Sequence, residues 1–150
     1  MKKFLIISVL LFSVLYSQDQ GYIDSLKTEI KKAKNEDKLS PYVKLAEYLQ
    51  NYSPRESIEL TKEAITLSRQ HKNEKLADLY LILELNYSTL AKYDSSFYYS
   101  AKAKEIYTEH KDTLGLINAT NSIGIYYLNT NQQEKASESF TQIKTLAQQA

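Results

Sequence analysis

The chain has 150 residues, with 19 Lys and Arg against 18 Asp and Glu and a net charge of +1. It contains only 3 Gly and 2 Pro, which are too few turn-forming residues for a β-sandwich or barrel with many hairpins. The absence of Cys excludes a disulfide scaffold and a thiolate metal site, and the balanced charge gives no electrostatic footprint for nucleic acid.

Residues 1–17 are typical of a secretory signal peptide. Two lysines precede an apolar stretch from Phe4 to Tyr16, and Ser17 is a small residue suited to cleavage. As a helix this stretch is about 20 Å long, shorter than the roughly 30 Å of a bilayer core. We therefore expect export to the periplasm or the medium. A retained N-terminal anchor is the alternative, because Leu15 is larger than the residue usual at its position.

From residue 23 onwards, apolar residues recur with helical spacing, which predicts an all-α chain. A linker and a lead-in helix over 23–35 occupy residues 18–39. Ser40-Pro41 and Ser53-Pro54 are typical helix starts, because serine caps a helix and proline fits its first turn. Further helices are predicted at about 74–90, 94–110, 114–129 and 132–149, with Asp94 and Asn131 as start signals for two of them.

Residues 40–150 repeat themselves with a period of 39 to 40 residues. The recurring small residues are Ser57, Ser96 and Ala136, and seven residues further on stand Ala64, Ala103 and Ile143. Small residues seven apart share one helix face and let a paired helix approach closely. Each helix pair covers only part of its apolar surface until a neighbouring pair stacks on it. The sequence therefore predicts a repeat domain of stacked helix pairs.

The third repeat resembles the tetratricopeptide repeat (TPR) family. Residues 121–127 contain the aliphatic-Gly-x-x-Tyr pattern of the family's first helix, and residues 134–140 contain the Glu-Lys-Ala…Phe pattern of its second. Repeat two departs from the pattern, with Leu83-Glu84 in place of aliphatic-Gly, and repeat one has a shorter inter-helix turn. The resemblance implies a right-handed α-solenoid of antiparallel helix pairs, with about three repeats and a lead-in helix, in which Gly124 permits close packing.

Such a repeat domain is expected to be a non-catalytic scaffold that binds a protein or peptide in the cell envelope. The lead-in helix and the long repeat also resemble the exported sensory regions of bacterial two-component sensor kinases and related regulators. This narrower resemblance implies a second function, the N-terminal sensory region of a larger transmembrane kinase or transcriptional regulator. The reading frame downstream of Ala150 would separate the two.

The residues give no case for an enzyme, a cofactor or a metal site. The two histidines, His71 and His110, are both predicted in the last turn of a second helix, where the helix dipole favours a donor. Thirteen tyrosines are expected to fill the space between helices. One member of each adjacent pair, Tyr98-Tyr99 and Tyr126-Tyr127, should be exposed, because neighbours on a helix cannot both point inward.

The first helix of each pair is expected to line the concave side of the solenoid, where a partner would bind. The residues predicted there are Val43, Glu47, Gln50, Asp78, Leu81, Leu85, Ser88, Asn118, Asn121, Ile125 and Leu128. The amides of Asn118 and Asn121 suit an extended peptide backbone. On the last helix, Ile143 and Leu146 are expected to lack cover, which predicts self-association, a docked partner or a longer chain.

Overall fold

The computed structural model describes residues 20–70 and 75–149, and within these ranges the chain is all-α. A helix over 20–32 leads into the short 3-10 helix η1 (Asn35–Lys38). Six longer helices follow: α2 (Leu39–Leu49), α3 (Pro54–Gln70), α4 (Leu76–Thr89), α5 (Tyr93–His110), α6 (Thr113–Asn129) and α7 (Gln133–Gln149). The signal-peptide prediction falls on residues outside the described ranges.

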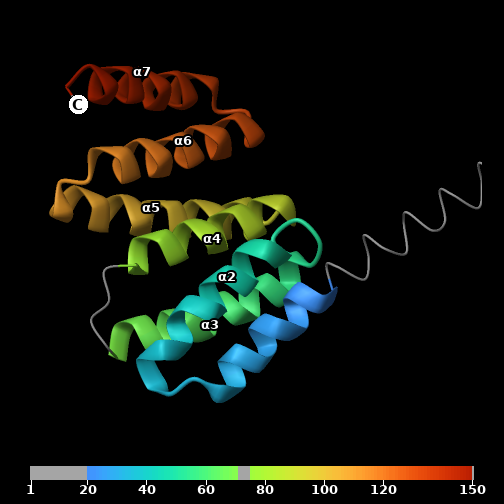
Figure 1. Cartoon of the computed structure of the whole chain (residues 1–150). Coiled ribbons are helices and arrows are strands. Elements are labelled where there is room, and N and C mark those ends of the chain that lie inside the picture. Colours follow the sequence, from blue (N-terminus) through green and yellow to red (C-terminus); the bar gives the residue numbers. More distant parts are fainter. Residues whose placement is uncertain (1–19, 71–74, 150) are drawn as a thin grey trace, which may run out of the picture.

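The helices form a repeat solenoid, which confirms the predicted fold class. Each helix packs against the next in chain order, so that α2 pairs with α3, α4 with α5 and α6 with α7 (Figure 1). The pairs are joined through contacts of α3 with α4 and of α5 with α6. The first helices of neighbouring pairs also touch, since α4 contacts both α2 and α6. None of the described helices is both long and apolar enough to span a bilayer.

Small residues lie where the helices approach, as the repeat pattern predicts. Ser57, Ala64 and Ala103 are fully buried, and Ser96 and Ala136 are nearly so. At Gly124 an added Cβ would lie 2.8 Å from the Phe140 ring, so the glycine allows α6 and α7 to pack closely. Larger side chains fill the remaining space in two core clusters, in which Leu45, Leu79 and Leu83 are fully buried.

Three turns have the same backbone conformation. Ala91, Lys111 and Asn131 all have a positive φ, between 54° and 58°, and they are twenty residues apart. After each helix, the N–H of this residue bonds to the carbonyl three residues back, and the next N–H bonds to the carbonyl five residues back. These are Schellman turns, which usually place glycine at the left-handed position. Asn131 is therefore a turn residue, and its predicted role as a helix start is wrong.

The other predicted helix starts are confirmed in part. α3 begins at Pro54, as expected, whereas α5 begins at Tyr93, so Asp94 lies within its first turn and is not its cap. Ser40 is not a cap, because η1 runs directly into α2 and the helix already begins at Leu39. Asp112 caps α6, since its side chain accepts a hydrogen bond of 2.9 Å from the Gly115 N–H.

The adjacent tyrosine pairs behave differently from one another. Tyr98 is exposed and Tyr99 is half-buried, as predicted for the first pair. Tyr126 and Tyr127 are both half-buried, so the prediction for the second pair is wrong. The reason is Phe97 of the preceding repeat, whose ring lies 4.6 Å from that of Tyr126 and 5.9 Å from that of Tyr127.

Candidate partner-binding surface

The first helices α4 and α6 carry most of the residues predicted to meet a partner, and we call their exposed side the first-helix surface. It consists of Asp78 and Leu85 of α4 and Asn118, Asn121, Ile125 and Leu128 of α6, which are exposed, and of Leu81 and Ser88 of α4, which are half-buried, with Leu81 also packed against the core. These residues occupy equivalent positions, forty apart, on two helices in contact. Large aliphatic side chains lie open to solvent on it: Leu85 and Leu128 are 49% exposed and Ile125 is 39% exposed.

Repeat one contributes less to this surface than predicted. Glu47 is exposed and Gln50 is half-buried, but Val43 is buried in the core cluster that also contains Leu39 and Ala77. Assigning Val43 to the partner surface is therefore wrong. The physical reason is that α2 packs against α3 and α4, and buried residues of both helices, such as Ile58 and Ala77, belong to the same cluster as Val43.

Charge is unevenly distributed between first and second helices. α6 contains no charged residue, and α4 contains only Asp78 and Glu84. By contrast, α3 alone has six: Arg55, Glu56, Glu59, Lys62, Glu63 and Arg69. The Asp78 carboxylate accepts a hydrogen bond from the Tyr107 hydroxyl. The first-helix surface is thus made mainly of aliphatic and amide groups, with acidic but no basic residues on α4 and α6.

Glu84 occupies the repeat-two position that corresponds to Gly124, and it joins three helices. Its side chain is buried, and its carboxylate accepts hydrogen bonds from Ser96 of α5 at 3.0 Å and Ser122 of α6 at 2.9 Å. Burial raises the pKa of Glu84, although the two serine hydroxyls act in the opposite direction. The departure from the family pattern at residue 84 is therefore a buried polar bridge between repeats two and three.

The raised pKa of Glu84 predicts a pH-dependent stability. Well below pH 4.5, its ordinary pKa, the group is protonated in both folded and unfolded chains. As the pH rises, the unfolded chain loses this proton first, so the free energy of unfolding falls until the folded state ionises as well. Glu84→Gln should remove this decline, because the amide keeps hydrogen-bonding groups without a charge. Urea unfolding of both proteins between pH 4 and pH 8 measures it, and two parallel pH profiles would contradict it.

The described residues show no arrangement suited to metal binding. No group of three His, Asp or Glu side chains lies close enough to hold an ion within residues 20–70 and 75–149. His110 is exposed at the end of α5, as the helix-end interpretation expects, and His71 lies outside the described ranges.

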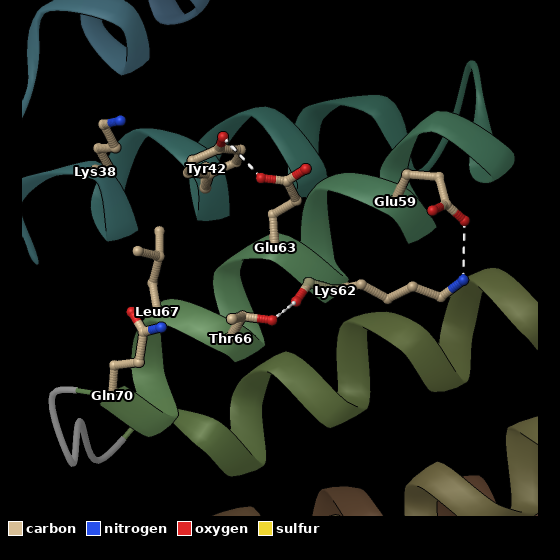
Figure 2. Close-up of a pocket in the computed structure, with 8 residues that line it drawn as sticks. All are labelled: Lys38, Tyr42, Glu59, Lys62, Glu63, Thr66, Leu67 and Gln70. Carbon is tan, nitrogen blue, oxygen red and sulfur yellow. Dashed lines mark hydrogen bonds and ion pairs between the residues drawn. The ribbon is translucent and has the colours of Figure 1, made fainter. Parts of the chain in front are cut away.

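Two of the hollows among the described residues lie beside α3, and neither was predicted from the sequence. One, of about 460 Å³, is bounded by η1, α2 and α3 (Figure 2). The Tyr42 hydroxyl donates to Glu63 at 3.1 Å beside it, and Lys62 pairs with Glu59 at 2.9 Å. The side chains of Lys62 and Glu59 are both solvent-exposed, so this ion pair is screened by water. The other, of about 300 Å³, lies between α3, α4 and α5.

A scan against protein-family models finds no match to this sequence, and a search of curated proteins finds none either. Solved structures do match. The chain is similar to aspartyl phosphate phosphatase F from Bacillus subtilis, with a TM-score of 0.79 and 16% identity over 85% of this chain and 34% of that one. It is also similar to the TPR domain of Arabidopsis FLU, with a TM-score of 0.71 and 18% identity over 78% of this chain and 100% of that one.

These similarities concern the fold. The chain spans about a third of the length of phosphatase F, and the whole of the FLU domain is covered. The helix pairs, the forty-residue period and the small residues at the helix contacts agree with the same architecture. The chain therefore has the fold of a tetratricopeptide-repeat protein.

Proposed function

We propose that the protein is a non-catalytic scaffold that binds a protein or peptide segment on the first-helix surface. The observation that carries this proposal is the exposure of Leu85 and Ile125, which are forty residues apart, and of Leu128 one turn after Ile125. Exposed aliphatic groups gathered on one face favour an interaction surface, because they gain free energy when a partner covers them.

The chemistry of the surface favours an extended and largely apolar segment. Asn118 and Asn121 are exposed on α6 beside the aliphatic residues, and their side-chain amides can both donate to and accept from a peptide backbone. Asp78 is the charged residue of this surface, so a basic group on the partner is favoured over an acidic one.

The cellular setting is part of the same proposal. The sequence of residues 1–17 supports export, so we place the scaffold in the cell envelope. The second candidate is the N-terminal sensory region of a longer transmembrane sensor kinase or transcriptional regulator. It is supported by the lead-in helix and the long repeat, which resemble the exported sensory regions of such proteins. The reading frame beyond Ala150 distinguishes the two: a membrane span and an effector domain would support the sensor.

Peptides selected from a random display library against the folded protein provide a direct test. Replacing Leu85 by Asp and Asn121 by Ala removes one aliphatic and one amide contact, and we expect the Kd of the selected peptides to rise at least about tenfold. The measurement is fluorescence anisotropy with labelled peptide. Tyr52→Asp is the matched control, because Tyr52 is 69% exposed in the turn between α2 and α3. Unchanged affinity in the double variant would remove the first-helix surface as the binding site.

A further inference from the structure

The smaller hollow, between α3, α4 and α5, combines an apolar floor with aromatic walls, and we call it the tyrosine hollow. Ile65 of α3 and Leu83 of α4 form the floor, and both are buried. Its volume of about 300 Å³ is at the lower end of the range for small-molecule sites. The hollow is therefore large enough for a single small ring.

The walls of the hollow are tyrosine rings from two helices. Tyr80 of α4 is buried, and its ring centre lies 5.8 Å from that of Tyr99 of α5. The Tyr98 ring stands edge-on to Tyr99 at 5.1 Å, and it is 56% exposed. Tyr99 is held in this wall by stacking on Tyr87 at 5.5 Å. The ring left open for a flat ligand is therefore that of Tyr98.

The rim of the hollow is cationic. The Arg69 guanidinium donates to the Tyr80 hydroxyl at 2.7 Å, which holds it beside the aromatic wall. A guanidinium has five N–H donors, so this bond leaves it capable of binding an oxyanion. Lys62 also lines the hollow, but its ammonium group forms an ion pair with Glu59. No Asp or Glu is among the described residues that line the hollow, so the charge of Arg69 faces no acid inside it.

We propose that the tyrosine hollow binds a small aromatic anion, meaning a planar ring that carries a carboxylate or a phosphate. The ring would lie against Tyr98 and Tyr99 above the apolar floor, and the anion would accept from Arg69. A ligand needs both a ring and an anion to contact both the tyrosines and Arg69. A neutral ring leaves the guanidinium without its anion, and a free anion leaves the aromatic wall in water.

The tyrosine hollow is separate from the first-helix surface. Successive residues of a helix are 100° apart, so Tyr80 and Leu83 lie on a different side of α4 from Leu81 and Leu85. Its other residues come from the second helices α3 and α5. The proposal therefore stands whether or not the first-helix surface binds a peptide.

Titration of the isotope-labelled full chain, followed by NMR, tests the proposal. The probes are phenyl phosphate and benzoate, with inorganic phosphate and benzyl alcohol as the anion and the ring alone. We expect saturable chemical-shift changes around Tyr98 and Tyr99 with phenyl phosphate or benzoate. Inorganic phosphate and benzyl alcohol, which carry only the anion or only the ring, should bind with affinities at least about tenfold lower. Equal binding of inorganic phosphate and phenyl phosphate would overturn the proposal, as would the absence of shifts with either aromatic anion.

Variants assign the roles of the individual side chains. Arg69→Gln should weaken phenyl phosphate binding about tenfold or more, because it removes a charge-assisted hydrogen bond. Tyr98→Ala should weaken it through the lost ring contact. Arg55→Gln is the matched control, since Arg55 is exposed at the opposite end of α3. Full binding by Arg69→Gln would contradict the site, whereas Leu85→Asp should leave this binding unchanged whatever it does to peptides.

Discussion

Replacing Gly115 by Ala is expected to destabilise the folded chain by about 3 kcal/mol, the upper part of the range for overpacked cores. The added Cβ would lie 2.6 Å from Cγ of Tyr107 and closer still to Cδ1. The ring has little freedom to move away, because Tyr107 is only 6% exposed and its hydroxyl donates to Asp78. Thermal unfolding should show a Tm lower by roughly 10 °C.

Two further variants test whether this contact is the cause. Gly21→Ala adds the same methyl group where nothing lies within 4 Å, so it should leave the Tm unchanged or slightly higher. Combining Gly115→Ala with Tyr107→Leu should recover part of the lost stability, because the smaller side chain leaves room for the methyl group. A Gly115→Ala protein as stable as the parent would contradict the packing of α5 against α6.

The second large effect is expected from Leu79, and it separates the core of α4 from its partner surface. Leu79 is fully buried, so Leu79→Ala should cost about 3 kcal/mol of unfolding free energy. Leu85 is six residues further along the same helix and 49% exposed, so Leu85→Ala should cost no more than about 0.5 kcal/mol. Urea unfolding measures both.

The variant with the larger effect should be the other one when peptide binding is measured. Below its unfolding transition, Leu79→Ala should bind the selected peptides with the parent affinity, whereas Leu85→Ala should bind them several-fold more weakly. Both variants replace a leucine of α4 by alanine, so they differ only in the side of the helix that is altered. Equal losses of stability at the two positions would show that the exposed side of α4 has been assigned wrongly.

The architecture could be predicted from the sequence because its causes are local and repeated. The small residues Ser57, Ser96 and Ala136 recur at the period of the helix pairs, and the structure buries all three. The turns were harder to predict. Glycine usually marks a left-handed helix end, and here Ala91 and Lys111 adopt that conformation instead. The residue types in these turns therefore did not indicate the left-handed backbone conformation.

The features that sequence reasoning missed depend on contacts between helices far apart in the chain. Val43 was predicted to face a partner, but α3 and α4 pack against α2 and include it in the core cluster. Tyr126 and Tyr127 are neighbours on one helix, so one of them was expected to face solvent, but Phe97 from the preceding repeat packs against Tyr126. In the tyrosine hollow, Arg69 and Tyr98 are 29 positions apart (98 − 69) and belong to different repeats, so no single motif contains them.

The three identical turns have a consequence for how the molecule can be lengthened. Ala91 follows a first helix and Lys111 follows a second one, yet both leave the helix by the same backbone path as Asn131. A duplicate of residues 92–131 spliced in after Asn131 would start and finish in this conformation. The solenoid can thus gain one helix pair without any new geometry at the joints, and modular growth is built into its backbone.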